Sequence, residues 1–324
     1  MIKDIIAGPI LRRATAEDMV IWWVSPRECQ GNFYCYQDNQ QVLALNLSSP
    51  DVKHFRCGQR AVVHLLHLEN HQLATDTLLE YDLEIHGEQE KKCLIELAPK
   101  IVYPGYQRPS FVIPTKINNL LHGSCRNPHH FSHDSLLQGD KKLADNISSP
   151  QKRPAILMLS GDQIYADHVA GPMLFAIHQV IDLLGLNQET FSQASMASSE
   201  ELHKGQPHYY LRELILPLTD VNKAWYQSKK SAIFTSVYAH NHLISFAEMM
   251  AMYLLVWSDT PWRFVHISED PVDDRYKPQF RQEQQTITGF CDTLPAVRRL
   301  LAHLPTYMIF DDHDVTDDWN LTRG

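Results

Sequence analysis

Alternating apolar and polar positions predict β-strands in the first third of the chain. Between residues 79 and 85 every second side chain is apolar, and glutamate or aspartate occupies the positions between them. A period of two indicates a strand with one buried face. Largely apolar runs predict further strands at residues 19–24, 42–47 and 61–68. Several short strands at the start of a chain are typical of a β-sandwich.

A proline-rich stretch separates this region from the rest. Residues 99–114 contain four prolines and Gly105, which predicts a linker. Beyond it, strands are predicted at residues 119–122, 155–160 and 306–310. Helices are predicted between them at residues 169–184, 209–216 and 240–257. This alternation indicates an α/β layer structure, so we expect a β-sandwich domain at residues 1–110 and a second domain at residues 111–324.

The remaining segments of the second domain give weaker patterns. Apolar residues recur every three or four positions between residues 287 and 304, which predicts a helix. We expect it to be interrupted, with Pro295 in the first turn of a second helix that Thr293 caps. Residues 138–152 and 193–206 are polar and are predicted to be loops.

Composition limits the classes of function. The 324 residues are 44% apolar and 21% charged, as in ordinary globular proteins. A net charge of −9 argues against a nucleic-acid-binding surface. The six cysteines form no CxxC pair and no secretory signal precedes them, so we expect reduced thiols and a cytoplasmic location. Residues 243–257 are too few for a membrane span and predict a buried helix, with Met249, Met250 and Met252 filling the core.

Polar residues follow two of the predicted strands directly. Asp162 and Tyr165 come after residues 155–160, and Asp167 and His168 extend this polar group. A lone aspartate at such a position is most often a helix cap, but one turn brings Tyr165 back towards Asp162. Carboxylate and phenolate oxygens are hard ligands that suit a ferric ion. The segment therefore predicts one half of a metal site.

The second such segment is denser in charge. Residues 311–314 are Asp-Asp-His-Asp and follow the strand at residues 306–310. Adjacent carboxylates repel one another unless cations neutralise them, so metal binding explains the cluster better than an acidic surface loop does. Ligands of open α/β sheets collect at the carboxyl ends of parallel strands. We therefore expect Asp162 and Asp312 to lie close together.

A third strand end adds a thiol and a guanidinium. Cys125 follows the strand at residues 119–122, and a cysteine in such a place is most often a small buried residue. If Cys125 faces the same cleft, its thiolate can bind a metal and Arg126 can hold a phosphate. The neighbouring histidines of residues 129–133 are interpreted as a solvated loop and left out of the site.

These motifs together resemble a known family. Gly-Asp-x-x-Tyr after one strand and Asp-Asp-His-Asp after a later one are similar to the calcineurin-like metallophosphoesterases, and most closely to the alkaline phosphatase D (PhoD-like) family. Residues 8–15 leading to Trp22 and Trp23 resemble the start of that family's β-sandwich, and residues 123–126 resemble its first active-site segment. The resemblance implies an α/β fold: a β-sandwich followed by a four-layer αββα metallophosphoesterase domain.

The resemblance also implies roles for single residues. Asp162 bridges the metals, Tyr165 and Cys125 bind iron, and Asp312 replaces the asparagine usual in the wider superfamily. His313 orients the substrate and protonates the leaving oxygen. The implied cofactors are iron with calcium or another divalent ion.

The implied activity is metal-dependent hydrolysis of a phosphomonoester or phosphodiester, with a small phosphate ester as substrate. Relatives place further metal-binding histidines after this point, so we expect an incomplete metallophosphoesterase domain that needs the remainder of the same protein. Two alternatives stay open: a noncatalytic phosphate- or metal-binding module completed by a partner, and a purely structural β-sandwich protein with an inert appended domain. Metal content would separate the three.

Overall fold

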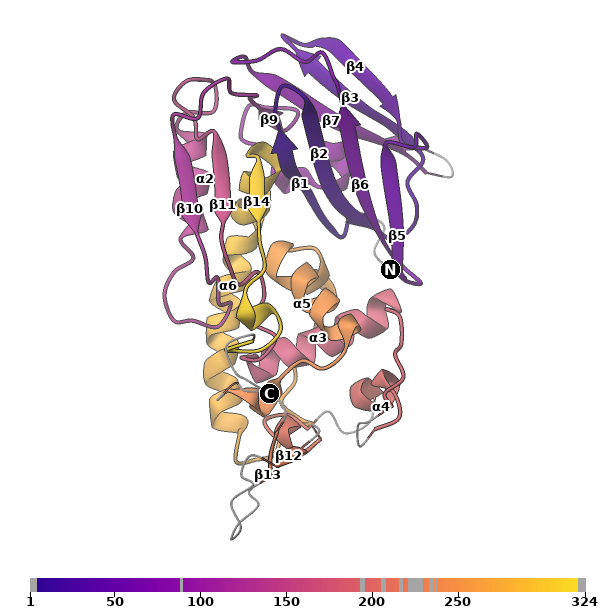
Figure 1. The fold of residues 1–324 in the computed structure, drawn as a ribbon, viewed down its shortest axis with the longest axis vertical. Coiled ribbons are helices and arrows are strands. Elements are labelled where there is room, and N and C mark those ends of the chain that lie inside the picture. The colour runs from indigo at the N-terminus through magenta and orange to yellow at the C-terminus, as the bar shows by residue number, and fades with distance from the viewer. Residues whose placement is uncertain are drawn as a thin grey trace.

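The computed structural model is a mixed α/β molecule with several antiparallel sheets and a group of helices (Figure 1). It describes residues 5–87, 90–192, 196–204, 208–215, 218–220, 230–232, 236 and 238–319. None of the described helices combines the length and the apolar character that crossing a membrane demands.

Two antiparallel sheets make up the amino-terminal part. The first has the order β1 (Ala7–Ala14), β2 (Asp18–Ser25), β6 (Ala61–Glu69) and β5 (Val52–Gly58). The second has the order β4 (Gln40–Asn46), β3 (Gly31–Gln37), β7 (Leu79–His86) and β8 (Lys91–Lys92), with β9 (Ser110–Phe111) also paired to β7.

The two sheets share one apolar core, as in a β-sandwich. Trp23 and Leu66 of the first sheet lie in the same buried cluster as Phe33 and Tyr81 of the second. Each such side chain stabilises the fold by roughly 1.5–3 kcal/mol when it leaves water. The predicted strands at β2, β4, β6 and β7 are confirmed.

Three further strands, β1, β3 and β5, carry no clear period in the sequence. The edge strand β5 shows why, because most of its side chains face solvent and no apolar stripe is required. The proline-rich segment is packed onto the sandwich instead of forming a free linker. α1 (Leu94–Leu97) and the 3-10 turn η1 (Pro99–Ile101) precede β9, and Ile101 and Ile113 are buried in the sandwich core. The domain boundary near residue 110 stays a prediction.

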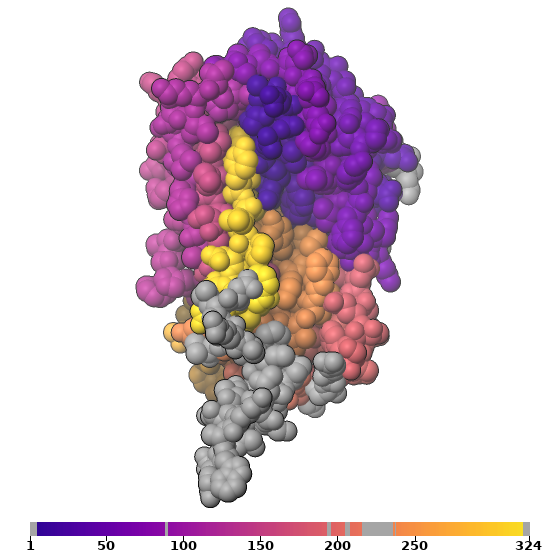
Figure 2. Space-filling model, in the orientation of Figure 1, coloured from indigo at the N-terminus to yellow at the C-terminus, as the bar shows by residue number. Residues whose placement is uncertain are grey.

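A small parallel sheet organises the second part. Its order is β10 (Leu120–Gly123), β11 (Ile156–Leu159) and β14 (Thr306–Met308), so the three predicted strands are confirmed. In Figure 2 the yellow carboxyl-terminal segment that contains β14 lies on the surface between the indigo and magenta strands. Elsewhere in the second part, β12 (Leu218–Asp220) pairs with β13 (Lys230–Ala232). A four-layer αββα arrangement stays a prediction.

The helices of the second part lie below and behind this sheet in Figure 1. They are α2 (Leu136–Ala144), α3 (Gly171–Leu184), α4 (Ser199–Lys204), α5 (Phe246–Trp257) and α6 (Lys277–His303). Short 3-10 turns are η2 (Arg212–Leu214), η3 (Ala239–Asn241), η4 (Pro261–Phe264) and η5 (Asp312–Asp314). The predictions of α3 and of a buried helix at α5 are confirmed; Met252 is buried, and Met249 and Met250 pack against the same core.

Four local predictions are wrong. Over residues 209–215, the described part of the predicted helix at residues 209–216, the structure has only the turn η2. The predicted loop at residues 138–152 contains much of α2, where Arg299 pairs with Asp140. α6 runs unbroken through Pro295, because the buried face around it outweighs the cost of about 3 kcal/mol for an interior proline. The predicted loop at residues 193–206 contains α4, and residues 193–195 and 205–206 lie outside the described residues.

The helices also cover the outer face of the first sheet. Ile6, Ile10 and Val24 lie in the same buried cluster as the apolar residues of α3, α5 and α6. Arg298 of α6 donates from Nε to the carbonyl oxygen of Gly8 at 2.7 Å, and its Nη1 pairs with Asp259 at 3.2 Å. The two parts of the molecule therefore share a packed interface.

Candidate metal centre

Three chain segments leave the parallel sheet at the same edge. Gly123 of β10 pairs with Leu159 of β11, which pairs in turn with Met308 of β14. Because the strands are parallel and in register, the residues after each of them emerge side by side. The segments that begin at Cys125, Asp162 and Asp311 are thereby brought together.

Two of these segments turn sharply at the site residues themselves. Cys125 has a φ of 57° and Asp162 a φ of 46°. This left-handed conformation costs residues with a side chain of the order of 1 kcal/mol, and it is found mostly where a function or a turn requires it. The turns let the two segments meet: the Cys125 amide donates to the carbonyl oxygen of Gly161 at 3.2 Å. At Gly161 a β-carbon would come within 3.0 Å of Asp311 Oδ2, so a larger residue would push the segments apart.

Asp314 fastens the segment after β11 to the segment after β14. Its carboxylate accepts hydrogen bonds from the backbone amides of Gln163 at 3.1 Å, Ile164 at 2.8 Å and Asp311 at 2.9 Å. These hydrogen bonds engage both carboxylate oxygens of Asp314 in holding the two segments together. Asp312 also accepts from the backbone, on Oδ1 from the His313 amide and on Oδ2 from the Asp318 amide, both at 3.0 Å.

Asp162, Asp312 and His313 form the centre of the site. Each offers a ligand atom, and the three atoms lie within 4.8 Å of one another. Asp162 is only 4% exposed, and its Oδ2 accepts a hydrogen bond from the Tyr165 hydroxyl at 3.3 Å. Its Oδ1 is buried and has no hydrogen-bond partner among the described residues. A buried carboxylate oxygen in this state costs free energy until something binds it.

Cys125 and Tyr165 lie against Asp162 and respond to its charge. Burial raises the pKa of Tyr165, and the Asp162 carboxylate and the Cys125 thiol raise it further. For Cys125 the Ser124 hydroxyl lowers the pKa, but burial and Asp162 outweigh it, so the net direction is upward. Within the described part of the chain no lysine or arginine pairs with Asp162 or Asp312. The donor set therefore matches a site that a cation would complete.

His313 is held by a carboxylate that the sequence analysis did not assign to the site. Its Nδ1 lies 2.9 Å and 3.0 Å from the two oxygens of Asp167, and its ring stacks on Tyr165 with centroids 4.8 Å apart. Burial lowers the pKa of His313, but the hydrogen bond and charge of Asp167 outweigh it and raise the pKa overall. The sequence signal was available, because Asp167 follows Asp162 by five residues in the same polar run.

Arg126 is not brought to this centre. Its guanidinium donates to Asp134 Oδ2 at 2.7 and 2.9 Å and lies 4.7 Å from the ring centroid of Trp257 and 4.5 Å from that of Phe290. It anchors the loop after β10 to α5 and α6. The guanidinium is thus engaged with Asp134, and the expectation that Arg126 holds a phosphate stays a prediction.

The histidines after Cys125 are not all solvated, as the sequence interpretation expected. His129 packs edge-on against His168, with ring centroids 4.3 Å apart, and burial lowers its pKa to about 3. His168 in turn stacks on Tyr238 at 4.1 Å. His130 and His133 are exposed. The interpretation therefore fails for His129, whose partner His168 is distant in sequence.

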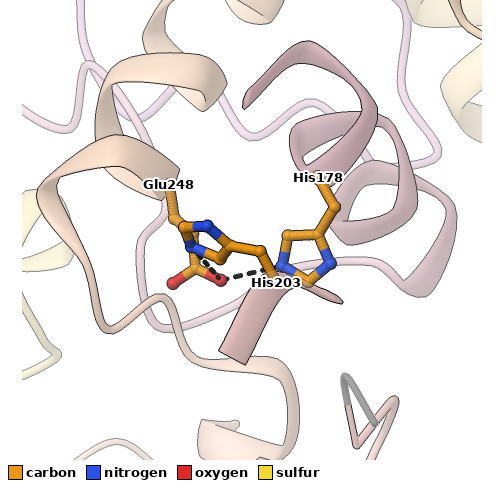
Figure 3. A group of neighbouring side chains, drawn as sticks. All are labelled: His178, His203 and Glu248. Atoms are coloured by element: carbon orange, nitrogen blue, oxygen red, sulfur yellow. Dashed lines mark hydrogen bonds and ion pairs between the residues drawn. The ribbon is translucent and has the colours of Figure 1, made fainter. Parts of the chain in front are cut away.

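A second group of metal-type ligands lies in the helical core. His178 of α3, His203 of α4 and Glu248 of α5 offer ligand atoms within 4.8 Å of one another, and Figure 3 shows both imidazole rings beside the carboxylate. Arg212 Nη2 lies 2.6 Å from Glu248 Oε1 and 3.0 Å from His178 Nε2. Burial alone would raise the pKa of Glu248, but Arg212 and His178 hold it well below its usual value. The guanidinium of Arg212 thus occupies the place that a metal ion would take.

Comparison with protein-family models gives no match, and comparison with curated proteins gives no significant match. Membership of the PhoD-like family therefore stays a prediction that rests on the motifs of this chain.

Proposed function

We propose that this chain is a metal-dependent phosphoesterase, or part of one, that resembles the PhoD-like family. The observation that carries the proposal is the unpartnered, buried Asp162 Oδ1 beside Asp312 and His313. A cation is the partner that such an acidic cluster lacks, since a further carboxylate would only add repulsion. The place of the cluster, at the carboxyl edge of parallel strands, is where α/β proteins hold ligands.

Asp162, Asp312, Tyr165 and Cys125 would hold the metals. The carboxylate and phenolate oxygens suit a ferric ion and calcium or another divalent ion, and the thiolate suits iron. When bound, these ions supply an activated water and neutralise the charge of the phosphate. The proposed fold of residues 111–324 is the αββα layering of metallophosphoesterases, and the parallel order β10-β11-β14 supports it.

His313 performs the proton transfer in this proposal. Asp167 holds its Nδ1, which fixes the ring and keeps a proton on the imidazole at neutral pH more readily than in a free histidine. Nε2 is then the atom that donates a proton to the leaving oxygen of the ester. Tyr165, stacked on the ring, limits its rotation.

One observation favours a second candidate, a noncatalytic metal-binding module. The guanidinium of Arg126 is engaged with Asp134, so it is not placed to bind the phosphate. A site with metals alone could bind an anion without turning it over.

Metal analysis combined with an esterase assay tests the proposal. The purified protein should contain iron, show the visible absorption band of a tyrosinate–iron complex, and hydrolyse 4-nitrophenyl phosphate or its bis-ester. Metal without hydrolysis would favour the binding module. Absence of bound metal after incubation with iron and calcium would overturn both.

A further inference from the structure

A cavity of about 420 Å³ adjoins the candidate metal centre. It lies between the loop after β10 and helix α6, and its volume falls in the range of small-molecule pockets, about 300–1,000 Å³. Cys125 lines it, and the same thiol interacts with Asp162 and Tyr165. The cavity therefore begins at the metal-binding end of the site and extends away from it.

The loop that forms one wall is firmly attached. Asp134 pairs with Arg126 at 2.7 Å and accepts a hydrogen bond from Thr293 of α6 at 3.2 Å. The first contact holds the loop together, and the second ties it to α6 across the cavity. A cavity held open in this way is preformed, so little ordering is needed when a ligand enters.

The wall offers an aromatic face to whatever enters. The rings of His130 and Phe131 stack with centroids 4.4 Å apart, and Phe131 is 90% exposed although it lines the cavity. Asn127, Gln285 and Thr286 also line it and carry neutral donors and acceptors. Stacking faces together with amide and hydroxyl groups suit a planar ring with hydrogen-bonding edges.

Gly289 leaves the opposite wall of the cavity without a side chain at this position. It lies in the interior of α6, where glycine costs about 1 kcal/mol relative to alanine, and a β-carbon built there meets nothing within 4 Å. Gly139 in α2 differs, because a β-carbon there would come within 3.1 Å of Leu300. Packing thus explains the glycine of α2, whereas the glycine of α6 borders only the open cavity.

We propose that this cavity binds a nucleobase, so that the substrate of the site is the phosphate ester of a nucleoside. The inference rests on the proposed phosphoesterase function. The charge of the chain, −9, argues against a polymeric nucleic acid but not against a single nucleoside ester. The metal centre would hold the phosphate, and the cavity would hold the base.

Binding of adenosine to the metal-free chain is the first test, because it does not depend on turnover. Saturation-transfer NMR should detect adenosine on the wild type and on Thr288→Leu, a control on the exposed side of α6 outside the cavity. Gly289→Leu should abolish the signal by filling the space. Equal signals for Gly289→Leu and wild type would overturn the proposal, as would wild type that binds 4-nitrophenol but not adenosine.

Phe131 provides the second test without risk to the fold, since its side chain is exposed. Phe131→Ala should weaken adenosine binding at least about fivefold, and Phe131→Trp should retain it, because bases stack on any aromatic face. Unchanged binding in Phe131→Ala would contradict a stacked base.

Turnover separates this proposal from the function on which it rests. Adenosine 5′-monophosphate and ribose 5-phosphate present the same ester bond, so a higher kcat/KM for the former, lost in Gly289→Leu, would support the base pocket. Equal kcat/KM values would overturn it. Adenosine binding that Gly289→Leu removes, in a chain that hydrolyses neither ester, would support the pocket and contradict the phosphoesterase.

Discussion

The cluster of carboxylate and imidazole groups in the helical core and the one at the edge of the parallel sheet differ in where their positive charge comes from. In the helical core, Glu248 accepts from Arg212 and lies 2.9 Å from His178, so the protein supplies its own cation. At the edge of the parallel sheet, Asp162 and Asp312 have no such partner among the described residues, and Asp162 Oδ1 accepts no hydrogen bond there. Both clusters satisfy the same distance criterion for metal ligands.

The difference shows that ligand type and spacing alone do not identify a metal site. A buried ion pair with its hydrogen bonds made needs nothing further, and removing one partner leaves an uncompensated charge. An acidic cluster without a cation is incomplete as it stands. The comparison therefore predicts opposite responses to substitution in the two places.

The largest effect is expected at Asp162. Asp162→Asn should remove most bound metal and all detectable hydrolysis, because an amide oxygen lacks the charge that a bridging carboxylate supplies. The fold should be largely retained. Elemental analysis after dialysis measures this, with Asp292→Asn, an exposed residue on α6, as the matched control. Wild-type metal content in Asp162→Asn would mean that the ions bind elsewhere.

Glu248→Gln should act on stability instead. It leaves the charge of Arg212 buried without its carboxylate, a change that costs roughly 3–5 kcal/mol. The double variant Glu248→Gln with Arg212→Met should recover part of this loss, since no charge then remains. Urea unfolding of the three proteins gives the free energies. A fall in metal content with little destabilisation would instead identify the helical cluster as a metal site.

Much of the fold was predictable where a strand has one buried face or two. The alternation at β7 and the apolar runs at β2 and β11 identified strands because burial imposes the pattern. Where tertiary contacts decide, prediction failed. α2 is polar yet helical because Arg299 and Tyr103 hold Asp140. α6 continues through Pro295 because helix residues before and after this proline are buried in the core.

The candidate site was also predictable only in part. Strand ends predicted that Cys125, Asp162, Tyr165 and Asp312 would meet, and the structure brings them together beside His313. It could not be predicted that Arg126 packs between Trp257 and Phe290, because these rings come from helices distant in sequence. Their roles in metal binding and catalysis stay predictions.

A smaller effect is expected at Asp167, which contacts His313. Asp167→Asn should lower kcat about 10- to 100-fold with KM nearly unchanged, because the imidazole loses the partner that orients it and raises its pKa. Metal content should stay near that of the wild type. A changed KM with kcat intact would assign Asp167 to substrate binding instead of to positioning His313.

The smallest effect is a pH dependence that again separates the two clusters. Burial lowers the pKa of His203 to about 4, whereas an exposed histidine titrates near 6.5. Between these values the unfolded chain binds a proton that the folded chain does not, so stability falls as the pH drops from about 6.5 towards 4. His313 has the opposite sign: its raised pKa stabilises the fold below about pH 6.5, and this contribution is lost as the pH rises through the folded value.

Substitution of His203 tests this pH dependence. Between pH 6.5 and 4.5 the free energy of unfolding of His203→Gln should fall by roughly 1 to 2 kcal/mol less than that of the wild type, measured by urea unfolding at each pH. Identical losses in the two proteins would mean that His203 is protonated in the folded core and that burial does not keep it neutral.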